Sequence, residues 1–198
     1  MARFLGKQGH RVEHHRSLPW KEVPAFISEL RACPATPMTK GAFEFLILTA
    51  SRSTPVRLAE PQEIDWDERI WKVPLPHMKV DEPHEVPLAD RAIEILRSPG
   101  VGAGGLLFPN AIGRPLSDMT FTEVLKRMGY GDKATPHGFR SSFSTWAADT
   151  NQCRDEVAEA ALAHVVKSKI QAAYRRATYL DERVGLMSRW AAFCVLGG

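Results

Sequence analysis

The chain has 198 residues, of which 44% are hydrophobic and 25% are charged, and its formal net charge at pH 7 is +3. This composition is typical of globular proteins and excludes disordered, fibrous and disulfide-stapled classes, because a chain of this length can bury a sizeable core without cross-links. The longest apolar run, residues 42–50, is too short to span a bilayer, and residues 1–10 lack the features of a secretory signal. We therefore expect a cytoplasmic protein, and its three widely separated cysteines predict reduced thiols.

The N-terminal residues 1–16 are rich in arginine and histidine and contain few large apolar side chains. This segment is expected to be a basic tether that precedes a folded domain over residues 17–198. Apolar residues then recur at helical spacing over residues 20–30. Thr39 is expected to cap a second helix that continues to Ala50 and is apolar over much of its circumference, so this helix should be buried.

The pattern changes between residues 64 and 88, where short apolar stretches and several prolines predict a small antiparallel sheet with Lys79 near a hairpin tip. The rest of the chain is mostly helical, and Thr135-Pro136 is typical of a cap followed by a first helical residue. The expected helices cover residues 89–97, 117–129, 137–148, 155–163, 168–176 and 180–195. The predicted fold class is therefore α+β, mainly helical with a small antiparallel β-sheet.

Motifs typical of cofactor and metal sites do not fit their context in this chain. A Gly-x-Gly-x-x-Gly pattern at residues 100–105 follows a helix, whereas a dinucleotide-binding loop follows a strand and opens a helix. The histidines at 14 and 15, and the pair His77 and His84, lack the helical spacing and the thiolate neighbours of a zinc site. We expect them to be exposed or hydrogen-bonded, and we predict no cofactor and no metal.

A set of chemically versatile side chains is spread over the chain in a suggestive order. His137 and Arg140 are three residues apart, so they share one helix face near the helix N-terminus, where the helix dipole favours an anion such as phosphate. His164 ends a helical run, Tyr174 follows ten residues later on the next helix, and Arg52 lies just beyond the buried second helix. Each of these residues alone has an ordinary structural explanation, but their joint order favours a shared site.

That order resembles the catalytic domain of the tyrosine recombinases, and most closely that of phage and genomic-island integrases. The resemblance covers residues 17–195 and is carried by the segments 45–52, 78–79, 137–140, 158–164 and 173–176. It implies two phosphate-clamping arginines, a hairpin lysine, two active-site histidines and a nucleophilic tyrosine, which are Arg52 and Arg140, Lys79, His137 and His164, and Tyr174.

The chemistry of DNA strand cleavage agrees with this assignment. Two arginines remain charged and can each donate paired hydrogen bonds to phosphate oxygens. The lysine could protonate the leaving 5′ oxygen, and the histidines could exchange protons with the tyrosine or donate to the phosphate. Tyrosine, with an ordinary pKa near ~10, needs a cationic pocket to attack as phenolate.

Two assignments stay open on the sequence. Tyr130 and Tyr179 are rival nucleophiles, but Tyr179 follows Ala177-Thr178, where a helix break is expected, so we predict a structural role for it. A basic stretch without an intervening acid either contacts DNA phosphates or only forms a solvated helix surface. Its members are Lys167, Lys169, Arg175 and Arg176.

The sequence departs from the family pattern beside the first arginine. The family usually carries an acidic residue three positions after this arginine, where this chain has Pro55, and Ala50 stands where a glycine is usual. Thr54-Pro55 suits the start of the next helix, but Arg52 and a neighbouring histidine could lose orientation. A degenerate or non-catalytic DNA-binding remnant is therefore an alternative function. A protein that binds no nucleic acid is a third.

The resemblance also implies partners that this chain does not contain. Complete integrases have arm-binding and core-binding domains ahead of the catalytic domain, so we expect this chain to be a fragment. Its expected partner is double-stranded DNA at attachment sites, bound mostly through phosphates and therefore weakly at high salt. The full-length form is expected to act as a homotetramer on DNA with accessory DNA-bending proteins and no membrane.

Overall fold

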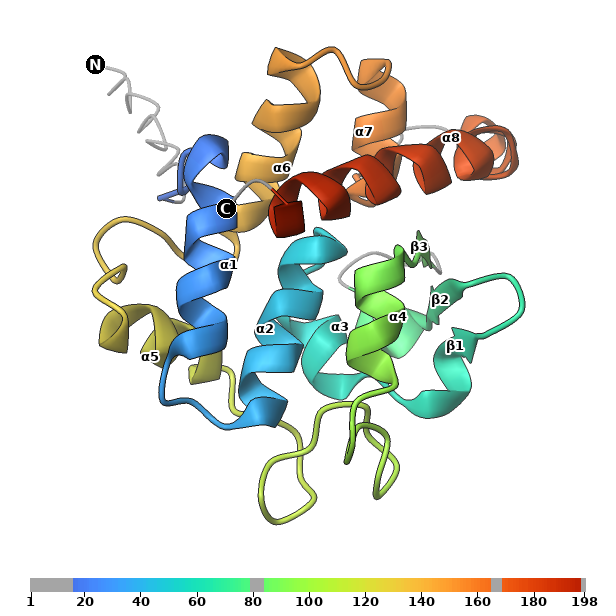
Figure 1. Cartoon of the computed structure of the whole chain (residues 1–198). Coiled ribbons are helices and arrows are strands. Elements are labelled where there is room, and N and C mark those ends of the chain that lie inside the picture. The colour runs from blue at the N-terminus through green and yellow to red at the C-terminus, as the bar shows by residue number, and fades with distance from the viewer. Residues whose placement is uncertain (1–15, 79–83, 165–168, 197–198) are drawn as a thin grey trace, which may run out of the picture.

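The computed structural model describes residues 16–78, 84–164 and 169–196, with side chains for all of these except residues 169–178. Within this part the chain is mainly helical with a small sheet, as predicted (Figure 1). The helices are α1 Val23–Ala32, α2 Pro37–Leu48, α3 Ser53–Leu58, α4 Asp90–Leu96, α5 Thr120–Arg127, α6 Gly138–Asp149, α7 Asp155–Ala161 and α8 Lys169–Leu196. Short 3-10 turns cover Trp20–Glu22, Pro61–Glu63 and Leu75–His77. None of the helices in the described part is long and apolar enough to cross a membrane.

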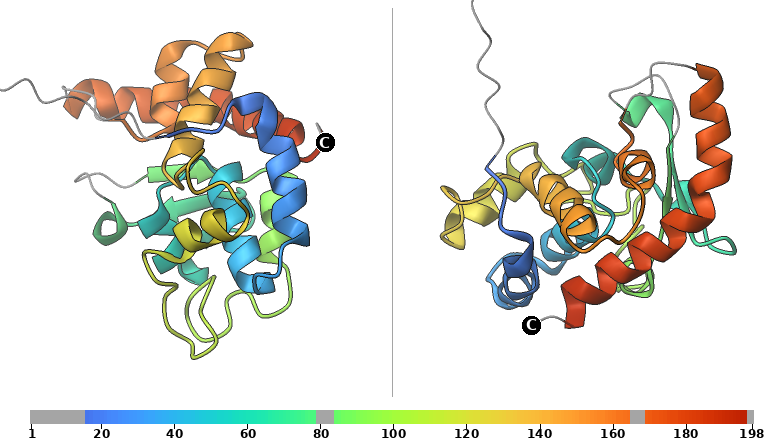
Figure 2. Two further views of the ribbon diagram at one scale, coloured as in Figure 1. Left: turned by 90° about the vertical axis from the view of Figure 1, so that its left-hand side faces the viewer. Right: turned by 90° about the horizontal axis from the view of Figure 1, so that it is seen from above.

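The sheet has three antiparallel strands in the order β1 (Ile64–Asp65), β2 (Ile70–Val73) and β3 (His84–Pro87). Trp71 in β2 lies opposite both Ile64 and Val86, so the apolar residues of the strands line up against the core. The sheet lies at the opposite side of the molecule from α5 (Figure 2). Lys79 falls between β2 and β3 in the chain, in a segment outside the described residues.

Helix α2 begins three residues earlier than expected. Thr36, in extended backbone, accepts a hydrogen bond from the Thr39 amide at 3.2 Å, and Pro37 occupies the first turn. The prediction that Thr39 caps this helix was therefore wrong. The reason is that a proline at the first position, which has no amide to satisfy, allows the threonine before it to cap the helix.

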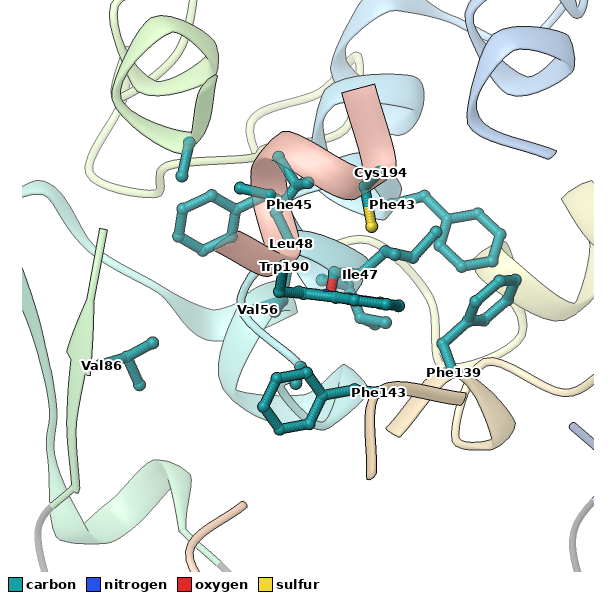
Figure 3. Close-up of a cluster of buried hydrophobic side chains, with 14 of the residues drawn as sticks. Phe43, Phe45, Ile47, Leu48, Val56, Val86, Phe139, Phe143, Trp190 and Cys194 are labelled. Carbon is teal, nitrogen blue, oxygen red and sulfur yellow. The ribbon is translucent and has the colours of Figure 1, made fainter. Parts of the chain in front are cut away.

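The core is built where α2, α6 and the second half of α8 meet. Trp190 of α8 lies among the side chains of α2 and α6 (Figure 3), and its indole nitrogen donates to the Ile47 carbonyl at 2.9 Å. The ring of Phe143 on α6 stands edge-on to Trp190, with centroids 5.6 Å apart. Helix α8 thus packs across α1, α2 and α4 and holds α6 in place.

Helix α8 is continuous, so the predicted break after Thr178 was wrong. A β-branched residue lowers helix propensity only slightly, and there is no proline at this point. Contacts to the start of α7 also stabilise the helix here. The Arg154 guanidinium forms an ion pair with Glu182 at 2.6 Å and lies over the ring of Tyr179 at 5.1 Å from its centroid.

Candidate functional site

Arg140 is the buried charge around which the candidate site is built. It lies in the first turn of α6 with only 5% of its surface exposed. Its Nη1 donates to the Ala50 carbonyl at 2.6 Å and its Nη2 donates to the Leu162 carbonyl at 2.5 Å. Thr135 holds the turn before α6, because its side chain accepts from the Gly138 amide at 3.0 Å. The helix itself begins at Gly138 with His137 as its N-cap, so the predicted cap and first helical residue at Thr135-Pro136 were two residues too early. One guanidinium therefore ties the ends of α2 and α7 to α6.

Both carbonyls that bind Arg140 lie at tight helix ends. Ala50 after α2 and Ala163 after α7 adopt left-handed backbone, with φ of 47° and 48°. In each turn the next amide reaches back to the helix, from Ser51 to Leu46 and from His164 to Glu159, both at 3.1 Å. Alanine at residue 50 thus preserves a turn that glycine would form with less strain.

Arg52 places a second positive charge beside Arg140. It is half-buried at the start of α3, and burial lowers the pKa of its guanidinium. Burial, followed by the charge of Arg52, lowers the pKa of Arg140 to about 9, so Arg140 remains charged at neutral pH. Within the described part of the chain, neither arginine has a carboxylate partner in an ion pair. Two neighbouring guanidiniums without such a partner favour the binding of an anion between them.

The two predicted histidines lie at helix ends close to Arg140 or its partner Leu162 in the chain. His137 immediately precedes α6, three residues before Arg140, and is exposed. His164 follows the left-handed turn after α7, two residues beyond the carbonyl that binds Arg140. Its Nδ1 lies 2.6 Å from Oε2 of Glu159. The structure thus brings Arg52, Arg140 and the turn that carries His164 together, with His137 one helical turn from Arg140.

The catalytic roles of all these residues stay predictions, and the other predicted residues lie wholly or partly outside what the structure describes. Tyr174 lies on α8, but its side chain is outside what the structure describes, and so are those of Lys169, Arg175 and Arg176. Lys79 and Lys167 lie outside the described residues altogether.

His84 is a neighbour of the site that the sequence alone did not assign to it. At the start of β3, its Nε2 lies 3.2 Å from the Ala161 carbonyl of α7, so this nitrogen is the donor. Burial, the nearby Arg183 and the two site arginines lower the pKa of His84 to about 3, so the imidazole is neutral. The prediction of a hydrogen-bonded histidine is confirmed. Only the fold brings β3 against α7, so no local pattern could have placed His84 here.

Arg183 was also missed. It is a buried residue of α8, 2% exposed, whose Nη1 donates to the Glu85 carbonyl of β3 at 2.8 Å. It therefore links α8 to the strand that follows the predicted Lys79 hairpin. Among the described residues, no group of three or more His, Cys, Asp or Glu side chains could hold a metal ion.

The family match and the similar curated proteins both identify integrases as relatives of this chain. The phage integrase family matches residues 16–180 of this chain. Prophage integrase IntA of Escherichia coli (strain K12) is 35% identical over 174 residues, covering 86% of this chain and 42% of IntA. The integrase of Enterobacteria phage P4 is 30% identical over 202 residues, covering 92% of this chain and 46% of the phage protein. The chain thus spans about half the length of these curated relatives.

Solved structures share the fold at low sequence identity. The integrase from mycobacterium phage Brujita has a TM-score of 0.66 at 18% identity, covering 94% of this chain and 61% of its own. A lambda integrase dimer bound to a COC' core site has a TM-score of 0.61 at 18% identity, covering 86% of this chain and 50% of its own. The family match covers most of the chain, and the fold agrees with it. This chain therefore belongs to the phage integrase family.

Proposed function

We propose that this chain is the catalytic domain of a site-specific tyrosine recombinase that cuts and reseals double-stranded DNA at attachment sites. The observation that supports this best is the pair Arg52 and Arg140. Two guanidiniums act on each other in one partly buried site, without a carboxylate partner among the described residues. Such a pair is costly unless an anion is bound there, and a DNA phosphate supplies two oxygens for it.

In this proposal each side chain takes one step of a transesterification. The Tyr174 oxygen attacks the phosphorus and forms a 3′-phosphotyrosyl bond, while the bond from phosphorus to the 5′ oxygen breaks. Lys79 gives its proton to the departing 5′ oxygen, and His137 or His164 takes the proton of the tyrosine. Arg52 and Arg140 stabilise the charge that develops on the non-bridging oxygens. Attack by a 5′ hydroxyl reverses these steps and reseals the strand.

The relatives suggest how the complete protein works. Solved relatives include a lambda integrase dimer on a core site and the Tn1549 transposon integrase in complex with circular intermediate DNA. We propose that residues 17–198 form the catalytic domain, that residues 1–16 tether it to arm-binding and core-binding domains, and that the full-length protein forms a homotetramer on DNA. Accessory DNA-bending proteins and a cytoplasmic location belong to the same proposal.

The test is capture of the covalent intermediate. The chain is incubated with a nicked suicide duplex, so that the cleaved strand diffuses away, and the products are separated under denaturing conditions. The wild-type chain should give a protein–DNA adduct that is absent from Tyr174→Phe. Tyr179→Phe, which changes a tyrosine packed beside Arg154, is the matched control and should still give the adduct.

Each outcome decides between functions. An adduct that persists in Tyr174→Phe refutes the assignment of the nucleophile. Salt-sensitive DNA binding without any adduct, also in a chain extended with its N-terminal domains, refutes the recombinase and leaves a DNA-binding remnant. Absence of DNA binding at low salt refutes both functions.

A further inference from the structure

A carboxylate on α7 contacts one of the two site histidines. Oε2 of Glu159 lies 2.6 Å from Nδ1 of His164, and the two side chains are 53% and 45% exposed. The backbone sets up this contact, because the left-handed Ala163 turns the chain and the His164 amide donates to the Glu159 carbonyl at 3.1 Å. The pair is thus a product of the same turn whose Leu162 carbonyl binds Arg140.

The contact determines which nitrogen of His164 carries the proton. An ionised carboxylate only accepts hydrogen bonds, so Nδ1 must be the donor toward Glu159. In the neutral imidazole the other nitrogen, Nε2, then has a lone pair that can take a proton. A histidine without such a partner would exchange between both tautomers.

The same carboxylate also acts on the phosphate-binding centre. The charge of Glu159 raises the pKa of Arg140, against the effects of burial and of Arg52. Glu159 therefore lies within electrostatic reach of both Arg140 and His164. At residue 55 this chain has a proline and no carboxylate, so the described acid that contacts a site histidine comes from α7.

We propose that Glu159 is a positioning residue that holds His164 in the tautomer with a proton on Nδ1, leaving Nε2 to exchange a proton during DNA cleavage. This inference rests on the proposed recombinase function and extends it to a residue that acts through His164. Half-exposed ion pairs contribute little to folding, so changing Glu159 should leave the domain folded.

The decisive variant is Glu159→Leu. Leucine keeps a similar side-chain volume and a high helix propensity but offers no hydrogen-bond acceptor to Nδ1, so nothing holds the proton on that nitrogen. Glu156→Leu is the matched control, because it removes an equal charge from an exposed position on the same helix.

Two measurements on each folded chain test the inference. Long-range ¹H–¹⁵N NMR spectra of the His164 ring, assigned with His164→Gln, should show a protonated Nδ1 in the wild type and in Glu156→Leu. They should show exchange between both tautomers in Glu159→Leu. Single-turnover cleavage of the suicide duplex should be slower in Glu159→Leu by about 10- to 100-fold, as for other orienting partners of histidine. DNA affinity should not weaken, because a negative charge is lost.

The outcomes separate this inference from the proposed function. An unchanged tautomer in Glu159→Leu, or a cleavage rate equal to that of Glu156→Leu, overturns the positioning role while the recombinase stands. If the wild type forms no adduct, the proposed function and the catalytic part of the inference fail together. The spectra then still decide whether Glu159 sets the tautomer. Weakened DNA binding together with slower cleavage would indicate a structural role and overturn the inference.

Discussion

The two backbone hydrogen bonds of Arg140 make a quantitative prediction for Arg140→Lys. The guanidinium fork reaches the carbonyls of Ala50 and Leu162, at 2.6 and 2.5 Å, whereas a lysine ammonium is a point donor that can retain one of them. The loss of a hydrogen bond to a charged group costs about 1.5–3 kcal/mol when the site is buried. An ammonium is also more strongly hydrated, so its burial adds to the cost.

The change should therefore lower the free energy of unfolding by at least about 1.5 kcal/mol. This is a large share of the total, because the unfolding free energy of a typical domain is only roughly 5–15 kcal/mol. Urea unfolding followed by tryptophan fluorescence measures it, because Trp146 and Trp190 lie in the core beside α6. The control is Arg127→Lys on the exposed end of α5, which should stay within about 0.5 kcal/mol of the wild type.

Catalysis should respond more strongly than stability. A lysine at residue 140 cannot bind two phosphate oxygens in the bidentate manner of arginine, so single-turnover cleavage should fall about 10²- to 10³-fold. If the unfolding free energy of Arg140→Lys equals that of Arg127→Lys, the two carbonyl bonds do not stabilise the fold and the reasoning is wrong.

Three further perturbations follow from the backbone and from His84. Ala163→Gly relieves the strain of an alanine in left-handed backbone at φ 48°, so the free energy of unfolding should rise by roughly 0.5–1 kcal/mol. A melting temperature below that of the wild type would contradict this. Gly138→Ala places a methyl group against the Arg16 carbonyl oxygen, so the free energy of unfolding should fall by about 1–3 kcal/mol in urea melts. If the variant is as stable as the wild type, the backbone at Arg16 can move away from residue 138. The pKa of His84 is about 3 when folded and 6.5 in its ordinary state, so the unfolded chain takes up a proton first as the pH falls. The free energy of unfolding should therefore drop by up to about 1.4 kcal/mol per pH unit below pH 6.5. In His84→Asn, the free energy of unfolding plotted against pH should have a smaller slope over this range.

Local signals in the sequence were sufficient for several elements. The apolar circumference of α2 and the change of pattern over residues 64–88 each depend on residues only a few positions apart, and the structure confirms them. The spacing of His137 and Arg140 likewise required their placement one helical turn apart. Competing local signals caused the error at the start of α2, where both Thr36 and Thr39 can cap a helix.

Only the tertiary structure decided what surrounds the site residues. The two carbonyls that bind Arg140 are 90 and 22 residues away in the chain, and His84 meets Ala161 across 77 residues. Arg154 at the start of α7 likewise pairs with Glu182 of α8, 28 residues later in the chain. Periodicity and capping report on neighbours within a helical turn or two, so they predict which residues form each element. Which charge becomes buried and which carbonyl it binds depend on how distant elements pack.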